Sequence, residues 1–486
     1  MPGNRPIVPL VLQEAGQGVV ALPIGQVPTG NERYANREPQ RCFPSVQVAS
    51  ESSFLPGKSG VLESLYPMSS LAKFSIGVGD RFGLEGEAQL SALQSAADRG
   101  VTVVPVWNKS NREHTLIGTA PSDVRANAAA AVQSRNWTAG YFVDADHIGL
   151  SNVDKFLDAS DFFTIDVADY IGKSATDTAI AAYIADMQRF VGELSIPGID
   201  HPIAVSNETL RQIASKYLFA VEEAGRVYRH IAEKKGARGF VTEVSFDEAS
   251  DPQSPAELFF ILAAAAREGI PADTVAPKFS GEFLKGIDYV GNVEQFTREF
   301  EEDLAVLAYA IRMFNLPVGL KLSIHSGSDK FSLYPIMHAA IAKANAGLHL
   351  KTAGTTWLEE VIGLAGAGGV GLAFAKALYR AGYTRFDEMA KPYLLVIAID
   401  RDKLPMPDAV DAYSAEEFVE TLQHVQSCKR FNIHFRQLVH ISFRIAAEMR
   451  EQYLPLLKAH RGQIETCVSE NILKRHVEPL FMGLKA

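Results

Sequence analysis

The feature that most constrains the fold is a regular alternation of short β-branched runs with longer helical patterns, which begins near residue 71. Such alternation is typical of a parallel sheet whose strands are joined by crossover helices. Strands are expected at residues 71–76, 101–106, 140–144, 163–167, 239–243, 274–278, 318–324 and 347–351. Helices are expected at 86–99, 121–135, within 174–235, and at 254–268, 293–314 and 333–346.

Eight strand-and-helix units in about 280 residues predict an α/β fold of the (β/α)8 TIM-type barrel class, which typically needs about 250 residues and tolerates insertions. The expected catalytic barrel spans residues 71–380, with a helical insertion near 174–235. An open, doubly wound parallel sheet is the alternative. Residues 1–70 read as a lead-in segment, with strand-like pieces at 18–22 and 45–49.

Residues 381–486 are expected to form a mostly helical C-terminal extension packed on the barrel. It begins with one more strand candidate at 393–399, and helical patterns follow at 415–424, 432–456 and 463–474.

Composition narrows the range of partners and compartments. The net charge is −10 and long basic runs are lacking, which argues against general nucleic-acid or acidic-membrane binding. The sequence shows neither a secretory signal nor an apolar run long enough to span a membrane. Cys42, Cys428 and Cys467 are far apart, which fits a reducing compartment, so a cytoplasmic protein is expected. Assembly into a homo-oligomer is left open.

In a (β/α)8 barrel, the chemistry collects at the C-terminal ends of the strands. One strand ends in Asp144, Asp146 and His147, more ionisable groups than a helix cap needs, although capping is the alternative interpretation. Glu243 stands where another apolar strand stops, and a surface carboxylate is its alternative. Asp247 and Glu248 are interpreted as loop or capping residues.

Two further strands end in histidine. Alternation places Lys321, Ser323 and His325 on one strand face, and His349 and Lys351 on one face of the next strand. His147, His325 and His349 therefore suggest a site for a divalent cation such as Zn, Fe, Co, Ni or Mn, although buried structural histidines are the alternative. Asp146 and Glu243 are a candidate acid–base pair beside it.

The small polar segment after the 318–324 strand offers backbone amides that can bind a carboxylate or hydroxyls. Its members Ser326, Gly327, Ser328, Asp329 and Lys330 are predicted to bind substrate. A second segment, Gly366–Gly371, has the G-x-G-x-x-G spacing of dinucleotide-binding sites. A helical pattern precedes its glycines, so we interpret it as a break between two helices and expect no NAD.

Two resemblances add to these predictions. The Asp146–His147 pair resembles the Asp–His pair of class II, zinc-dependent aldolases. Over most of the barrel, the chain resembles the tagaturonate epimerase family, which interconverts tagaturonate and fructuronate with a divalent metal. The segments that carry this resemblance are 142–148, 242–248, 276–281, 285–291 and 323–330.

The family resemblance implies roles for individual residues. Asp146 becomes the proton acceptor, Glu243 the proton donor with Glu282 as a weaker candidate, and His147, His325 and His349 the metal ligands. It also implies a sugar-acid substrate, whose carboxylate Lys278 or Lys330 would hold together with the amides of Ser326–Ser328.

The expected reaction is retro-aldol cleavage and re-addition, because removing a proton from the α-carbon of the ketone cannot invert the next carbon. Transient oxidation by a nicotinamide is the other route. Two other functions stay open, a class II type aldolase acting on sugar acids or ketoses and a non-catalytic sugar-acid binding protein.

Overall fold

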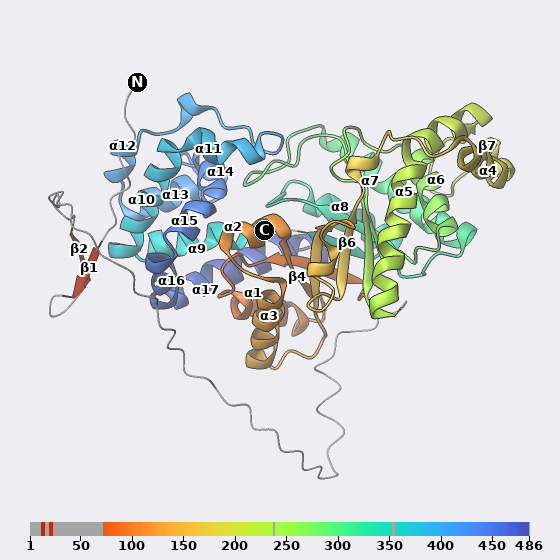
Figure 1. Ribbon diagram of the computed structural model, residues 1–486. Coiled ribbons are helices and arrows are strands. Elements are labelled where there is room, and N and C mark those ends of the chain that lie inside the picture. Colours follow the sequence, from red (N-terminus) through yellow and green to blue (C-terminus); the bar gives the residue numbers. More distant parts are fainter. Residues whose placement is uncertain (1–10, 15–18, 23–70, 237–238, 352–354, 486) are drawn as a thin grey trace, which may run out of the picture. The chain divides into compact units, whose positions relative to one another are not determined.

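The computed structural model describes residues 11–14, 19–22, 71–236, 239–351 and 355–485 (Figure 1). The chain divides into two units, Met1–Tyr66 and Pro67–Ala486. In the first unit, β1 (Val11–Glu14) pairs with β2 (Val19–Leu22) in an antiparallel ladder. The strand expected at 18–22 corresponds to β2, whereas the piece expected at 45–49 lies outside the described residues.

Eight parallel strands of the second unit close into a barrel, in the order β10-β11-β12-β3-β4-β5-β6-β9. Each predicted barrel strand is confirmed, with ends that shift by a few residues, and closure excludes the open sheet. The strands are β3 (Phe74–Gly79), β4 (Val104–Ser110), β5 (Phe142–Ile148), β6 (Phe162–Asp166), β9 (Val241–Ser245), β10 (Thr274–Ala276), β11 (Lys321–His325) and β12 (Leu348–Lys351).

The barrel interior changes from apolar to polar along the strands. A small cluster, separate from the main core, fills the end where the strands begin, and it contains Leu71, Val104, Val106, Phe142, Phe162 and Val241. Two residues after Val106 of β4 and Phe142 of β5, the same alternation brings Asn108 beside Asp144. In the neighbouring pair of strands, Thr164 of β6 lies in register with Glu243 of β9. Buried polar groups therefore gather where the strands end, which is where barrels place their sites.

Helices surround the barrel and bury its outer face. They are α1 (Gly86–Ala97), α2 (Asn111–Ile117), α3 (Pro121–Arg135), α5 (Asn207–Lys235), α6 (Pro255–Arg267), α7 (Val293–Phe314), α8 (Tyr334–Ala344) and α9 (Thr355–Gly366). Helix α6 shows why the sequence starts a helix there, because Ser254 accepts a hydrogen bond from the Glu257 amide and Pro255 occupies the first turn. The helices expected from the apolar spacing are confirmed.

The stretch 174–235, where a helical insertion is expected, contains two helices and a short antiparallel strand pair. Helix α4 (Asp177–Met187) is followed by an antiparallel pair, β7 (Gly192–Leu194) and β8 (Ile203–Val205), and not by continuous helix. Helix α5 then leads directly into β9, so it belongs to the barrel itself. In Figure 1, α4 and β7 lie at the outer end of α5 and α6.

The C-terminal extension begins after α9. Helix α9 ends at Gly366 and α10 (Gly369–Thr384) begins within the same glycine run, which confirms the predicted break between two helices. The rest is α11 (Phe386–Ala390), α12 (Pro407–Asp411), α13 (Ala415–Leu422), α14 (Ile433–Ile441), α15 (Phe443–Glu448), α16 (Arg450–Ala459), α17 (Arg461–Glu470) and a π-helical segment, η7 (Asn471–Met482). Figure 1 shows α10–α15 on one side of the barrel.

The strand predicted at 393–399 is wrong. The closed barrel has no free edge to which a further strand could add. The backbone of this segment makes single hydrogen bonds instead, such as the one from the Lys285 amide to the Val396 carbonyl, 2.8 Å. Within the described part of the chain, none of the helices is long and apolar enough to cross a membrane.

Candidate metal centre and active site

His147 stands at an irregularity in β5. The register between β5 and β6 shifts between Ala145 and Ile148, and His147 has a φ of 52°, which a residue other than glycine rarely adopts. Its Nδ1 lies 3.2 Å from Oδ2 of Asp166, at the end of β6, and its Nε2 lies 3.8 Å from Oδ1 of Asp146. Strained backbone of this kind concentrates at functional sites.

His325, the last residue of β11, lies between two carboxylates. Its Nε2 is 2.8 Å from Oε1 of Glu243, and its Nδ1 is 3.0 Å from Oδ2 of Asp247. Ser245 fixes Asp247 by donating a hydrogen bond to Oδ1, 2.5 Å. The rings of His325 and His147 meet edge to face, with their centroids 5.3 Å apart.

His147, Asp247 and His325 form what we call the metal triad. Each offers one ligand atom, and these atoms all lie within 4.8 Å of one another, so the three residues could hold a metal ion. Two imidazole nitrogens and one carboxylate oxygen are a donor set that suits Zn²⁺ and other first-row divalent cations.

The charges around the triad favour a cation. Burial alone would lower the pKa of His325, but the carboxylates of Asp247 and Glu243 outweigh it and raise this pKa to about 10. For His147, burial is likewise outweighed by Asp146 and by the hydrogen bond to Asp166, and its pKa rises to about 9. Carboxylates that stabilise two imidazolium ions would equally stabilise a divalent ion in their place. The residues present therefore fit such an ion.

Of the three predicted ligands, the fold brings together His147 and His325, and it places His349 elsewhere. Nδ1 of His349 lies 2.9 Å from Oγ of Ser75, and its ring contacts Phe162 inside the barrel. Burial lowers its pKa to about 3, so this imidazole is neutral. Asp247, interpreted from sequence as a loop or capping residue, occupies the third position of the triad. The sequence feature that could have identified Asp247 is a carboxylate placed two residues beyond the end of β9.

A buried ion cluster adjoins the triad. Nζ of Lys351 lies 2.6 Å from Oδ1 of Asp146, 2.9 Å from Oδ2 of Asp144 and 3.7 Å from Oε1 of Glu243. Burial works against ionisation of Asp146, but Lys351 and His147 outweigh it and lower the pKa of this carboxyl. The pKa of Glu243, also buried, is held well below its usual range by His325 and then Lys351. Asp146 and Glu243, the predicted acid–base pair, therefore meet through Lys351, and both are ionised.

The segment Ser326–Lys330 uses most of its side chains to hold the fold. Nζ of Lys330 donates to the carbonyls of Ile287, 2.8 Å, and Leu284, 3.0 Å, and burial lowers its pKa to about 7. Asp329 pairs with Arg436 at 2.8 Å, and Oγ of Ser326 donates to the Lys351 carbonyl. These side chains contact the neighbouring strand β12, the loop at 284–287 and the extension.

The other predicted residues lie further out. Lys278 follows β10 and is half-buried, and its amide donates to Oε1 of Gln253, 2.7 Å. Glu282, the weaker candidate for the proton donor, is exposed and forms an antiparallel bridge with Val290.

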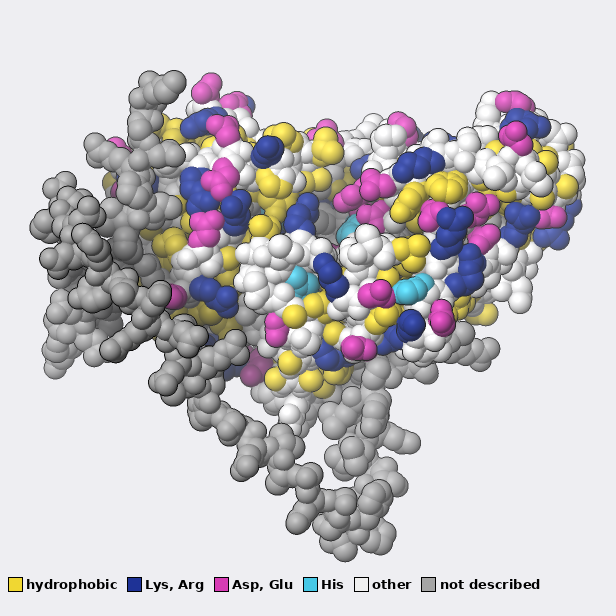
Figure 2. All heavy atoms as spheres, viewed as in Figure 1, with side chains coloured by type: hydrophobic (Ala, Val, Ile, Leu, Met, Phe, Trp, Pro, Cys, Tyr) yellow, Lys and Arg dark blue, Asp and Glu magenta, His cyan; other side chains and the backbone are white. Residues whose placement is uncertain are grey.

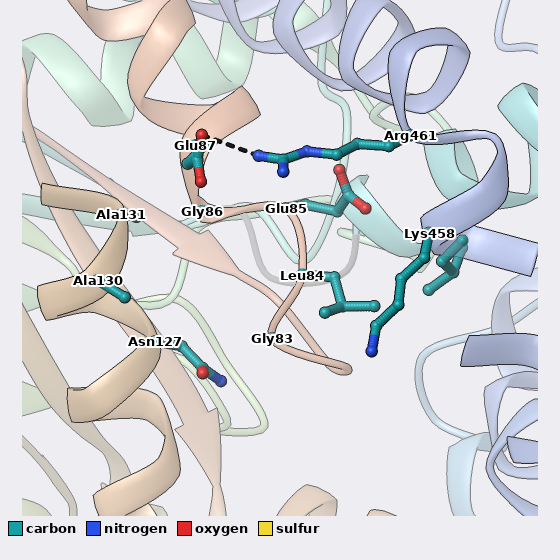
Figure 3. A pocket seen from close by; sticks show the side chains of 11 residues that line it. Gly83, Leu84, Glu85, Gly86, Glu87, Asn127, Ala130, Ala131, Lys458 and Arg461 are labelled. Carbon is teal, nitrogen blue, oxygen red and sulfur yellow. Dashed lines mark ion pairs between the residues drawn. The ribbon is translucent and has the colours of Figure 1, made fainter. Parts of the chain in front are cut away.

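Figure 2 shows a hollow between the extension and the barrel, in which a histidine side chain is visible and acidic side chains gather on the barrel side. A different cavity, of about 340 Å³, opens beside the loop between β3 and α1 (Figure 3). Its charged residues include Lys458 and the ion pair between Glu87 and Arg461, 2.8 Å, and none of the metal triad lines it.

Comparison with known proteins places the chain in a family. Residues 58–480 match the tagaturonate epimerase family. A tagaturonate/fructuronate epimerase of Thermotoga maritima is 30% identical over 435 residues, which cover 86% of this chain and 82% of that protein.

Solved structures agree with this placement. The native structure of the fructuronate-tagaturonate epimerase UxaE from Cohnella laeviribosi has a TM-score of 0.69 and 25% identity, covering 85% of this chain and 82% of that one. A two-glycerol complex of that enzyme has a TM-score of 0.70 at the same identity, covering 86% of this chain and 84% of the other. The barrel with polar strand ends thus belongs to an isomerase, and the chain is a member of the tagaturonate epimerase family.

Proposed function

We propose that this protein interconverts D-tagaturonate and D-fructuronate by metal-dependent retro-aldol cleavage and re-addition. Membership of the family supports the substrate pair. The observation that carries the chemistry is the adjacency of the metal triad to the ionised pair Asp146 and Glu243, because His325 of the triad lies 2.8 Å from Glu243.

The substrates dictate which groups are needed. They differ at the hydroxyl-bearing carbon one bond beyond the α-carbon of the ketone. A base removes the proton of that hydroxyl, the bond between this carbon and the α-carbon breaks, and its electron pair passes into the keto half as an enediolate. The other half becomes an aldehyde, which rotates and is attacked on its opposite face, and the new alkoxide takes the proton back. When bound, a divalent cation supplies Lewis-acid stabilisation of the negative charge on the keto half.

Asp146 is our proposed base. It is ionised, and Lys351 fixes one of its oxygens at 2.6 Å, so its orientation is set before substrate arrives. Glu243 is our proposed donor of the proton that the new alkoxide takes back. Because His325 and Lys351 keep Glu243 ionised, it must first take up the proton that Asp146 removed. His147, Asp247 and His325 would hold the cation, and His349 supports the barrel beneath them.

The route through transient oxidation has little support. A dinucleotide fingerprint needs a strand that leads into the glycines. Helix α9 leads into Gly366–Gly371, so this run lacks the arrangement that cradles a pyrophosphate.

Metal analysis paired with an activity assay tests the proposal. Purified protein should contain close to one equivalent of a divalent metal, and chelation should abolish epimerisation until metal is restored. NMR of a tagaturonate incubation should show an epimer mixture. Net three-carbon products would indicate an aldolase instead, and ligand binding without turnover would indicate a sugar-acid binding protein.

A further inference from the structure

Three cationic or imidazole side chains that interact electrostatically with one another come from separate parts of the chain. Arg81 lies between β3 and α1, Lys285 lies between β10 and α7, and His440 lies on α14 of the extension. We call Arg81, Lys285 and His440 the anion cluster. The site residues predicted from sequence include none of them.

Arg81 is buried, with 7% of its surface exposed, yet only one of its guanidinium nitrogens lies near an acceptor among the described residues. Its NH2 group lies 3.2 Å from Oε1 of Glu113, and its guanidinium lies over the ring of Phe443, 4.3 Å from the centroid. Nε and NH1 have no hydrogen-bond partner among the described residues. Buried guanidinium nitrogens without an acceptor cost free energy, so their retention points to an anion that binds them.

Helix α14 brings the other two members together. Gln437 donates from Nε2 to the Lys285 carbonyl, 3.0 Å, which anchors the Lys285 backbone to the helix. Gly286 has a φ of +79°, and a Cβ there would lie 3.5 Å from Cβ of His440, so the loop passes close to α14. His440 is 1% exposed, and both of its ring nitrogens lack a partner within the described part of the chain.

The Lys285 ammonium interacts electrostatically with several charged groups, among them the Asp146 carboxylate. Burial lowers the pKa of Lys285, and the nearby charges of Arg81 and Arg112 lower it further, whereas Glu113 and Asp146 raise it. No described residue forms an ion pair with the Lys285 ammonium. Burial also lowers the pKa of His440, as do Arg81 and Lys285, so its imidazole is neutral and offers one N–H donor.

We propose that Arg81, Lys285 and His440 bind the carboxylate of the sugar acid and retain the anionic aldehyde fragment after the carbon–carbon bond breaks. This inference rests on the proposed function. Retro-aldol cleavage leaves the carboxylate on the aldehyde half and the electron pair on the keto half. The aldehyde half must turn over without leaving, and a fixed carboxylate end lets it rotate about its own carbon chain. Retention by the cluster is thus what separates an epimerase from an aldolase.

The test uses Arg81→Gln and Lys285→Met, with Lys458→Met as the matched control. Lys458 is an exposed lysine of the cavity in Figure 3 and takes no part in the anion cluster. Calorimetry in an Asp146→Asn background, which stops turnover, gives the Kd of tagaturonate and of its neutral analogue D-tagatose. Loss of a charge-assisted contact should raise the Kd of tagaturonate about tenfold or more, while the Kd of tagatose changes less than about twofold. The control should leave both values unchanged.

A second measurement follows the fragments. With Asp146 intact, Arg81→Gln should release three-carbon products detectable by NMR, which the wild type retains. Equal loss of affinity for both sugars, or unchanged affinity for tagaturonate, would overturn the carboxylate assignment, and absence of released fragments in an active variant would overturn retention. A wild type that binds tagaturonate through the cluster but does not epimerise it would contradict the proposed function alone.

Discussion

Nζ of Lys351 lies 2.6 Å from Oδ1 of Asp146, and both side chains are buried at the end of the barrel. The same ammonium lies 2.9 Å from Oδ2 of Asp144 and donates to Oγ1 of Thr164, 2.7 Å. One lysine thus compensates several carboxylates that have little access to water. The site therefore depends on Lys351 for its folding as well as for the ionisation of Asp146.

Lys351→Met should lower the free energy of unfolding by about 3–5 kcal/mol, because it leaves buried carboxylates without their counterion. Urea denaturation of the metal-free protein measures this change. Lys343→Met is the matched control, since Lys343 pairs with Glu301 on the surface at 3.2 Å and should change stability by less than about 0.5 kcal/mol. Equal losses in the free energy of unfolding of the two variants would show that the buried cluster stabilises the fold no more than a surface ion pair does.

Asp146→Asn should reduce kcat by about 10²–10⁴-fold, the usual contribution of a general base, and should leave the metal content unchanged. The amide keeps the shape of the carboxylate but cannot accept the proton. Steady-state kinetics with tagaturonate and metal analysis of the same preparation measure both quantities. Asp169→Asn, an exposed aspartate after β6, is the control, and full activity in Asp146→Asn would remove Asp146 from the role of base.

His325→Ala should lose bound metal, whereas His349→Ala should retain it. His325 contributes to the triad, and Nδ1 of His349 contacts Ser75 inside the barrel. Mass-spectrometric metal analysis of the purified variants distinguishes the two positions. Loss of metal in His349→Ala, with thermal unfolding still cooperative, would restore His349 as a ligand and contradict the triad.

The sequence predicts the barrel well because each strand has to be apolar on its outer face, and this leaves a readable pattern. The depth of a residue in the barrel is harder to predict. His349 and Lys351 share a face, but the register sets His349 opposite Ser75 and Lys351 opposite Gly77, so that Lys351 is the one that reaches Asp146. That register depends on the pairing of the last strand with the first, which no local pattern contains.

Other parts of the site depend on tertiary structure in a similar way. His147 contacts Asp166 only because β5 is irregular and the backbone of His147 takes a positive φ. His440 and Arg436 lie in a helix more than a hundred residues after Lys285, and helical spacing predicts only that their helix exists. Partners of this kind are brought together by the packing of the extension, which sequence spacing does not specify.

The stability of the protein should depend on pH through Lys321, a residue that lies away from the site. It is buried at the end of the barrel where the strands begin, and its ammonium donates to the backbone carbonyl of Ala72. Burial lowers its pKa from 10.5 to about 8, although Asp273 opposes the shift. Between pH 8 and 10.5 the unfolded chain holds the Lys321 proton more firmly than the folded chain, so stability should rise with pH through this window.

The effect is measured as a difference between wild type and Lys321→Met, so that groups common to both proteins cancel. The free energy of unfolding of the wild type relative to the variant should rise by about 3 kcal/mol between pH 8 and 10.5, as a shift from 10.5 to about 8 implies. Urea denaturation at a series of pH values gives this curve. A flat difference would mean that Lys321 titrates alike in the folded and unfolded chains.

Arg436 joins the extension to the loops around the site. Its guanidinium is fully buried and donates from Nε to the Gly286 carbonyl, 2.6 Å, and from NH2 to Asp329, 2.8 Å. Arg436→Met leaves the Asp329 carboxylate buried without its guanidinium, so we expect a loss of about 3–5 kcal/mol in the free energy of unfolding. Arg380→Met is the control, because Arg380 is 43% exposed where it pairs with Asp408, and it should cost less than about 1 kcal/mol.

The double variant Arg436→Met, Asp329→Asn separates charge from packing. Removing the carboxylate as well should recover part of the lost stability, since replacing both partners of a buried pair costs less than breaking it. Recovery would show that the charge of Asp329, deprived of the Arg436 guanidinium, causes most of the loss. If the double variant is instead as unstable as the sum of the two single variants, Arg436 acts mainly through its contact with Gly286, and the loop that carries Lys285 should then be the first part to exchange its amide hydrogens with solvent.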